Sequence, residues 1–273
     1  MSDRVGVHQR VRSFKFETVP HYWFGGDPWR TRCFDAFSSM LPIGERLFVE
    51  SLRRAAAELV DPEIDALVAS FAHQEGVHTR EHRRYNERLR TQGYDIDGWD
   101  RSQKRTIDRL RALADVRVPL AVTVAAEHVA ATVGQAVLAH DLLADAHPEM
   151  KAFWEWHSAE EIGHKGAAFE LFTRVGGGPH LRRAIMAWVL VIIAARTGYR
   201  CAYMLRRDRK LFDGATWRSA ARFLLGDKGL VALVGPDLRA FFRRDFHPSH
   251  GIGSTATQVS SFTVSLGVVP PPL

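Results

Sequence analysis

The sequence predicts an all-α fold whose centre is a four-helix bundle. Four long segments place apolar residues at alternating steps of three and four, which is the spacing that puts side chains on one face of a helix. A connection of about 25 residues separates the second segment from the third, whereas the other two connections are short. One long crossover of this kind is typical of the ferritin-like topology.

The bundle helices are bounded by capping and breaking signals, because Asp followed by Pro starts helices and Gly ends them. We expect bundle helices over residues 41–59, from Asp61-Pro62 to just before Gly93, from about Pro119 and from about Pro148. The crossover should hold a short helix of its own, over about residues 101–114.

The segments outside the bundle differ from it in composition. Residues 1–33 are rich in aromatics, Gly and Pro and lack helical periodicity, so they predict an ordered N-terminal arm. The bundle then covers 34–176, and a basic, apolar helical extension covers 177–250, with helices around 184–195, 217–225 and 230–244. Residues 251–273 are Ser/Thr/Val-rich and end in prolines, which predicts a poorly ordered tail.

Composition indicates an ordinary globular protein of a reducing compartment. The 273 residues are 46% apolar and 25% charged. Cys33 and Cys201 are far apart and match neither a disulfide framework nor a zinc motif. Residues 1–12 lack the apolar core of a secretory signal, so we expect a cytoplasmic protein.

The positive charge is concentrated in the C-terminal third. Residues 176–250 hold 14 Lys and Arg against 5 Asp and Glu, while residues 1–175 carry a net charge of −3. Either a solvated basic face or an anionic partner such as a membrane surface would explain this, and no nucleic-acid motif is present. The apolar run 184–195 is shorter than the roughly 20 residues that span a bilayer. We expect it to pack on the bundle, with peripheral membrane contact as the alternative.

Acidic and histidine residues interrupt all four apolar stripes. A buried carboxylate without a partner costs several kcal/mol, so its presence on a core face requires a compensating cation. The interruptions are Glu45 in the first segment, Glu75 and His78 in the second, Glu127 in the third, and Glu161 and His164 in the fourth. Each Glu-x-x-His places a carboxylate and an imidazole one helical turn apart, on the same side of the helix.

This pattern predicts a site for two metal ions. A single Glu-x-x-His arises often by chance, but two in register with apolar stripes, plus one inward Glu on each other helix, match the dinuclear carboxylate arrangement. A metal-free network of paired carboxylates and histidines is the alternative. Carboxylate and imidazole ligands without thiolate favour iron, with manganese as the other candidate.

Further polar residues lie near the six expected ligands. His157 and His82 share the inward face, each four residues from an expected ligand. We expect His157 to be a seventh ligand, whereas His82 is as well explained as a core or supporting histidine. Glu81, His128 and Glu160 point elsewhere on their helices and should be supporting or surface groups.

Five sequence blocks resemble a known family. They are LPIGERLFVESLR, FAHQEGVHTREHRRYN, AAEHVAA, FWEWHSAEEIGHKGAAFE and FRRDFHPSH, in this order between about Val11 and His250. They are similar to the bacterial predicted metal-dependent hydrolases with a ferritin-like fold, and this resemblance implies the same six ligands. The pattern His157-x-x-x-Glu161-x-x-His164 also resembles that of di-iron arylamine N-oxygenases.

Three functions fit these expectations. The favoured one is an oxygenase in which two iron ions receive electrons from a donor and use O2 to oxidise a small hydrophobic substrate. The small residues Ala130, Ala131 and Gly134 would leave room for that substrate. The alternative is a hydrolase with a metal-activated water, and a less favoured one is an iron-handling protein.

Overall fold

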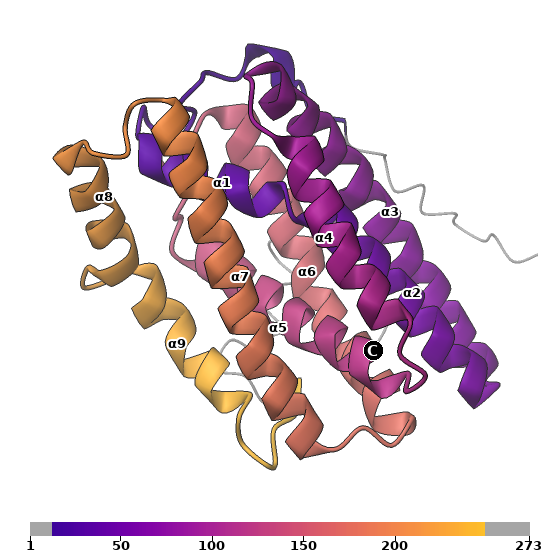
Figure 1. Ribbon diagram of the computed structural model, residues 1–273. Coiled ribbons are helices and arrows are strands. Elements are labelled where there is room, and N and C mark those ends of the chain that lie inside the picture. The colour runs from indigo at the N-terminus through magenta and orange to yellow at the C-terminus, as the bar shows by residue number, and fades with distance from the viewer. Residues whose placement is uncertain (1–12, 249–273) are drawn as a thin grey trace, which may run out of the picture.

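The computed structural model describes residues 13–248, and these residues form an all-α structure (Figure 1). The bundle helices are α2 (Leu41–Leu59), α3 (Pro62–Thr91), α5 (Arg117–Ala139) and α6 (Pro148–Arg174), and α4 (Ile96–Arg111) lies in the crossover. Within the described range, β-pairing is limited to an isolated antiparallel bridge between Phe24 and Ala146. The predicted all-α bundle is therefore confirmed.

Side-chain caps fix where the bundle helices begin. Asp61 accepts a hydrogen bond from the Glu63 backbone N–H and is followed by Pro at the first helical position of α3. His147 caps α6 in the same way through the backbone N–H of Glu149. Because these signals are local, the expected starts of α3 and α6 agree with the structure.

The crossover helix and the N-terminal arm differ from expectation. The crossover helix begins at Ile96 rather than near residue 101, because Asp95 accepts a hydrogen bond from the Gly98 backbone N–H and starts it earlier. The N-terminal arm contains most of a helix, α1 (Pro28–Ser38), which is capped by Asp27 and crosses the expected boundary at residue 33. The aromatic and glycine content of the arm concealed this Asp-Pro start.

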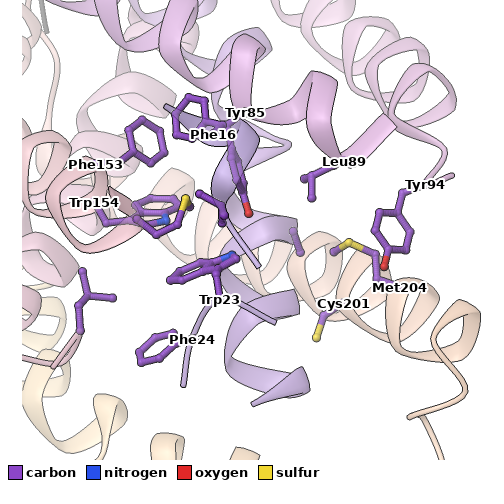
Figure 2. Packing of buried hydrophobic residues seen from close by; sticks show 14 of the residues in the cluster. Phe16, Trp23, Phe24, Tyr85, Leu89, Tyr94, Phe153, Trp154, Cys201 and Met204 are labelled. Carbon is purple, nitrogen blue, oxygen red and sulfur yellow. The ribbon is translucent and has the colours of Figure 1, made fainter. Parts of the chain in front are cut away.

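Two apolar clusters fill the ends of the bundle. One cluster contains Ile64 and Phe71 from the first half of α3. It also contains Leu171 and Phe172 from the end of α6. The other is aromatic and joins the arm to the bundle: Phe16, Tyr85, Phe153 and Trp154 contribute to it (Figure 2). The polar residues of the expected site lie between these clusters along α3 and α6.

The C-terminal third adds three described helices to one side of the bundle, namely α7 (Pro179–Arg207), α8 (Gly214–Leu225) and α9 (Leu230–Ala240). α7 packs on α1 and α5, α8 packs on α1, and α9 packs on α5 and α8 (Figure 1). α7 extends well beyond the expected 184–195, whereas α9 ends before the expected residue 244. The expected tail, residues 251–273, lies outside the described residues.

Candidate metal centre

The four bundle helices bring the expected ligands together in the interior. The side chains involved are Glu45 on α2, Glu75, His78 and His82 on α3, Glu127 on α5, and His157, Glu161 and His164 on α6. Each of these residues is at most 3% exposed. The helix-face pattern of the sequence thus corresponds to one compact polar cluster inside an apolar bundle.

The potential ligand atoms form two groups. Glu75, His78, Glu161 and His164 place one ligand atom each within 4.8 Å of one another, and Glu45, His82 and His157 form a second such group. Glu127 belongs to neither group, but its Oε2 lies 3.7 Å from His164 Nδ1. The cluster thus contains a candidate site for two metal ions.

The cluster leaves many polar atoms without hydrogen bonds. Among the described residues, fifteen buried side-chain N and O atoms lack a hydrogen-bond partner, and nine of them belong to this cluster. They include both carboxylate oxygens of Glu75 and of Glu127. Such atoms are costly to bury and are normally paired, so their convergence indicates a missing partner. Four carboxylates match the charge of two divalent cations, and the donor set therefore fits a dinuclear metal site.

His78 is oriented from behind by a carboxylate. Its Nε2 lies 2.8 Å from Oε2 of Glu160, which can only accept, so this nitrogen carries the proton and donates. The other ring nitrogen, Nδ1, faces the cluster, 3.2 Å from Glu161 Oε1. Glu160 is itself held by the indole N–H of Trp156, which donates to its Oε1 at 2.9 Å. Glu160 therefore supports His78, in agreement with its expected position off the inward face.

His164 is oriented in the same sense by an amide. Its Nε2 donates to the side-chain oxygen of Gln74 at 3.0 Å, which leaves Nδ1 directed at Glu75 Oε1, 2.7 Å away. Gln74 was not among the predicted residues, because a single polar residue one position from an expected ligand carries no distinctive signal in the sequence.

His82 has a third supporting arrangement. Its Nδ1 lies 2.8 Å from the Ser38 hydroxyl, and that hydroxyl donates its own proton to Asn86 Oδ1 at 3.0 Å. Ser38 must therefore accept from His82 Nδ1–H, so the unprotonated Nε2 is buried without a partner. Ser38 comes from α1, and sequence spacing along α3 could not reveal it.

The carboxylates of the cluster differ in their affinity for protons. Burial raises the pKa of Glu45 and Glu127 well above the ordinary value, and neighbouring carboxylates raise it further. Burial also disfavours the charge on Glu75, but the contacts with His164 and His78 outweigh it and lower that pKa to about 2. A cluster that holds protons on some carboxylates is one in which bound cations would replace protons.

The imidazoles divide in a similar way. Burial lowers the pKa of His82 and His157 well below its ordinary value, so both rings are neutral, which is the form that binds metals. Burial opposes protonation of His78 as well, but its contacts with Glu160 and Glu161 raise its pKa well above the ordinary value. His157 Nε2 lies 3.6 Å from Glu161 Oε1, so the expected seventh ligand belongs to the second group and also lies beside the first.

Two other residues expected to lie off the inward face have different surroundings. Glu81 is buried and forms ion pairs with Arg80 and Arg84. His128 is buried against Phe241 and faces the backbone carbonyl of Asp237 at 3.2 Å. Neither belongs to the groups of potential ligand atoms.

The prediction that Gly134 leaves space for a substrate along α5 is wrong. A Cβ atom at this position would lie 2.9 Å from the backbone oxygen of Ser158 on α6, closer than real Cβ contacts. The absence of a side chain at Gly134 therefore lets α5 and α6 approach each other, rather than leaving an open volume.

A family model described as "Predicted metal-dependent hydrolase" matches residues 8–251, which is most of the chain. Searches of curated proteins and of solved structures found no match.

Proposed function

Because the chain belongs to the family of predicted metal-dependent hydrolases, we propose that it is a hydrolase that uses two divalent metal ions to activate water. The observation that supports this most is the convergence of four buried carboxylates, one from each bundle helix, of which Glu45, Glu75 and Glu127 have oxygens without a hydrogen-bond partner. Bound metal ions would supply Lewis acidity, which lowers the pKa of a water and stabilises developing negative charge.

The ions would be held by Glu45, Glu75, His78, Glu127, His157, Glu161 and His164, and we propose His82 as an eighth ligand. Support for His82 comes from its hydrogen bond to Ser38, which leaves Nε2 free in the group with Glu45 and His157. Glu160 and Gln74 fix the proton on Nε2 of His78 and His164, which keeps Nδ1 of each ring available.

The walls of the cluster favour a mostly hydrophobic substrate. The ring centroids of Phe71 and His164 are 4.7 Å apart, and those of Trp156 and His78 are 4.9 Å apart. On the other side, Phe153 lies 4.7 Å from His82. These rings exclude water and lower the local dielectric constant, which strengthens electrostatic interactions in the site.

Oxidation of an organic substrate by O2 is a second candidate function. It is favoured by His157, which adds a second imidazole on α6 to a donor set of carboxylates and imidazoles without thiolate. In this case the same residues would hold iron ions, which would supply the electrons that reduce O2. Such an enzyme would also need an electron donor.

One experiment on the purified chain separates these functions. The protein is loaded without O2 with Fe²⁺, Mn²⁺ or Zn²⁺, and bound ions are counted by mass spectrometry. The loaded protein is then tested with apolar carboxylic and phosphate esters without O2, and the iron form is separately tested for O2 consumption.

Ester turnover without O2 would support the hydrolase, provided that Glu161→Ala, which removes a carboxylate of the first group, abolishes both metal binding and turnover. O2 consumption by the iron form, without ester turnover, would instead support oxidation. Binding of no more than one ion would contradict the dinuclear site and both functions.

A further inference from the structure

Large exposed apolar side chains are concentrated in the C-terminal helices. Of the nine that occur among residues 13–248, seven lie between residues 188 and 231. They are Trp188, Val191, Tyr199, Phe212, Trp217, Leu225 and Val231. The other two, Val60 and Leu113, follow the ends of α2 and α4. Scattered apolar residues are normal on a surface, but such a concentration marks an interaction site.

The outward face of α7 is apolar along much of its length. Ala184, Ala187, Trp188, Val191 and Ala195 are exposed at helical spacing, and no charged residue occurs from 184 to 195. By length and composition, α5 and α7 are both apolar enough to cross a membrane, but the most apolar window of α5 is 78% buried and that of α7 is 22% buried. A helix that faces water normally carries polar residues on that side.

α8 and α9 lie on the same side of the bundle as α7 and add further exposed apolar side chains (Figure 1). α8 and α9 contact each other, and they share α1 and α5 with α7 as supporting helices (Figure 1). Phe212 before α8 is 94% exposed, and Leu225 at its end is 72% exposed. We name these seven large side chains, together with the exposed alanines of α7, the α7–α9 apolar face.

Basic side chains accompany this face. Arg206, Arg207 and Arg209 are exposed at the end of α7, and Arg218 and Arg222 are exposed on α8. Three rings with a polar tip, Trp188, Tyr199 and Trp217, also lie on the face, and such rings concentrate at membrane–water interfaces. An apolar surface with aromatic anchors and surrounding cations is complementary to an anionic lipid surface.

We propose that the α7–α9 apolar face binds an anionic lipid bilayer. The apolar side chains enter the boundary between headgroups and acyl chains, while the arginines contact lipid phosphates. This inference is independent of the reaction at the metal centre.

The packing of α7 indicates that it lies on a bilayer rather than crosses it. Its inner side buries Met186, Val189 and Met204 in the protein core. Arg200 on the same side is 3% exposed and donates to the Ser39 hydroxyl at 2.8 Å and to the Gln103 side chain. Insertion of α7 across a membrane would remove these contacts and bury Arg200 in hydrocarbon.

A second copy of the chain fits this face less well. A symmetric dimer places the same surface on both sides of the interface, so the arginines of one copy would approach those of the other. Like charges across an interface oppose association, whereas an anionic bilayer is attracted to them.

Flotation of the full chain with lipid vesicles tests the proposal. We expect binding to vesicles of mixed phosphatidylcholine and phosphatidylserine, weakening with added salt, and weaker binding to phosphatidylcholine alone. The double variant Trp188→Asp, Val191→Asp should reduce binding by about tenfold or more. The control Val60→Asp, Leu113→Asp replaces the two exposed apolar residues away from the face and should bind as the unchanged chain does.

Circular dichroism and the Tm of each variant show that it is folded. Failure of the unchanged chain to bind, or equal binding by the Trp188→Asp, Val191→Asp variant, would overturn the proposal. Light scattering tests whether the face instead joins two copies of the chain. If the unchanged chain is a dimer and the Trp188→Asp, Val191→Asp variant is a monomer, the bilayer proposal is also overturned.

Discussion

The carboxylate of Glu160 stands directly behind the imidazole of His78, with 2.8 Å between Glu160 Oε2 and His78 Nε2. The Trp156 indole N–H donates to the other oxygen of the same carboxylate. One side chain on α6 thereby fixes both the proton and the orientation of a ring on α3.

Glu160→Gln should weaken metal binding, because Trp156 and His78 donate to different oxygens of Glu160, and in glutamine one of these positions becomes an NH2 group that cannot accept. Groups that orient metal-binding histidines typically contribute about 10- to 100-fold to affinity, and we expect a loss in this range. Competition with a metal chelator measures it. The control is Glu170→Gln, the same substitution on α6 in a surface pair with Arg174. Equal affinity of both variants would show that Glu160 does not orient His78.

Ser38→Ala tests the assignment of His82 as an eighth ligand. Without the hydroxyl, His82 Nδ1–H loses its acceptor and the ring is free to protonate Nε2 instead. We expect weaker binding of one of the two ions and a changed iron or manganese spectrum, and His82→Ala should give a larger effect of the same kind. Ser51→Ala is the control, since Ser51 is also buried and bonded to a hydroxyl, that of Thr123. If all three variants keep the unchanged spectrum, His82 is a core histidine.

The sequence predicted which side chains gather in the buried cluster, because they share helix faces, and it missed most of the groups that support them. Glu75, His78, Glu161 and His164 lie in register with apolar stripes, and helical spacing alone determines which face they occupy. Ser38 and Gln74 are recognised only when other helices lie beside His82 and His164, so their role depends on tertiary packing. Glu160 is intermediate: its position off the inward face was predictable, but its partner was not.

In the fold as well, features set by local sequence were predictable, whereas features set by tertiary packing were not. Asp61-Pro62 and Pro148 mark helix starts locally, and α3 and α6 begin there. Gly134 was misinterpreted because a small residue on a helix suits either an open space or a close approach, and only the position of α6 decides between them.

The two cysteines should resist alkylation in the folded protein at about pH 8, because the thiolate is the reactive form. Burial raises the pKa of Cys33 to about 12, and burial raises the pKa of Cys201 further. Both thiols therefore remain protonated well above the ordinary range for a free cysteine. Mass spectrometry after iodoacetamide treatment should show modification of both only after unfolding in urea. Labelling of Cys201 in the folded chain, as fast as in urea, would contradict its buried position.

Gly134→Ala should destabilise the bundle although alanine favours helices. The new Cβ would lie 2.9 Å from the Ser158 backbone oxygen, so α5 and α6 must separate, and overpacking of this kind costs about 1–3 kcal/mol. Gly166→Ala on α6 is the matched control, because nothing lies within 4 Å of its Cβ position. That substitution should raise the free energy of unfolding by about 0.5–1 kcal/mol through helix propensity.

Urea unfolding of the metal-free chains measures both changes. Because Ser158 adjoins His157, separation of the helices at Gly134 should also weaken metal binding, whereas Gly166→Ala should leave it unchanged. A stabilising effect of Gly134→Ala would show instead that α5 and α6 have room at this crossing, and the substrate space expected from the small residues of α5 would again be open to test.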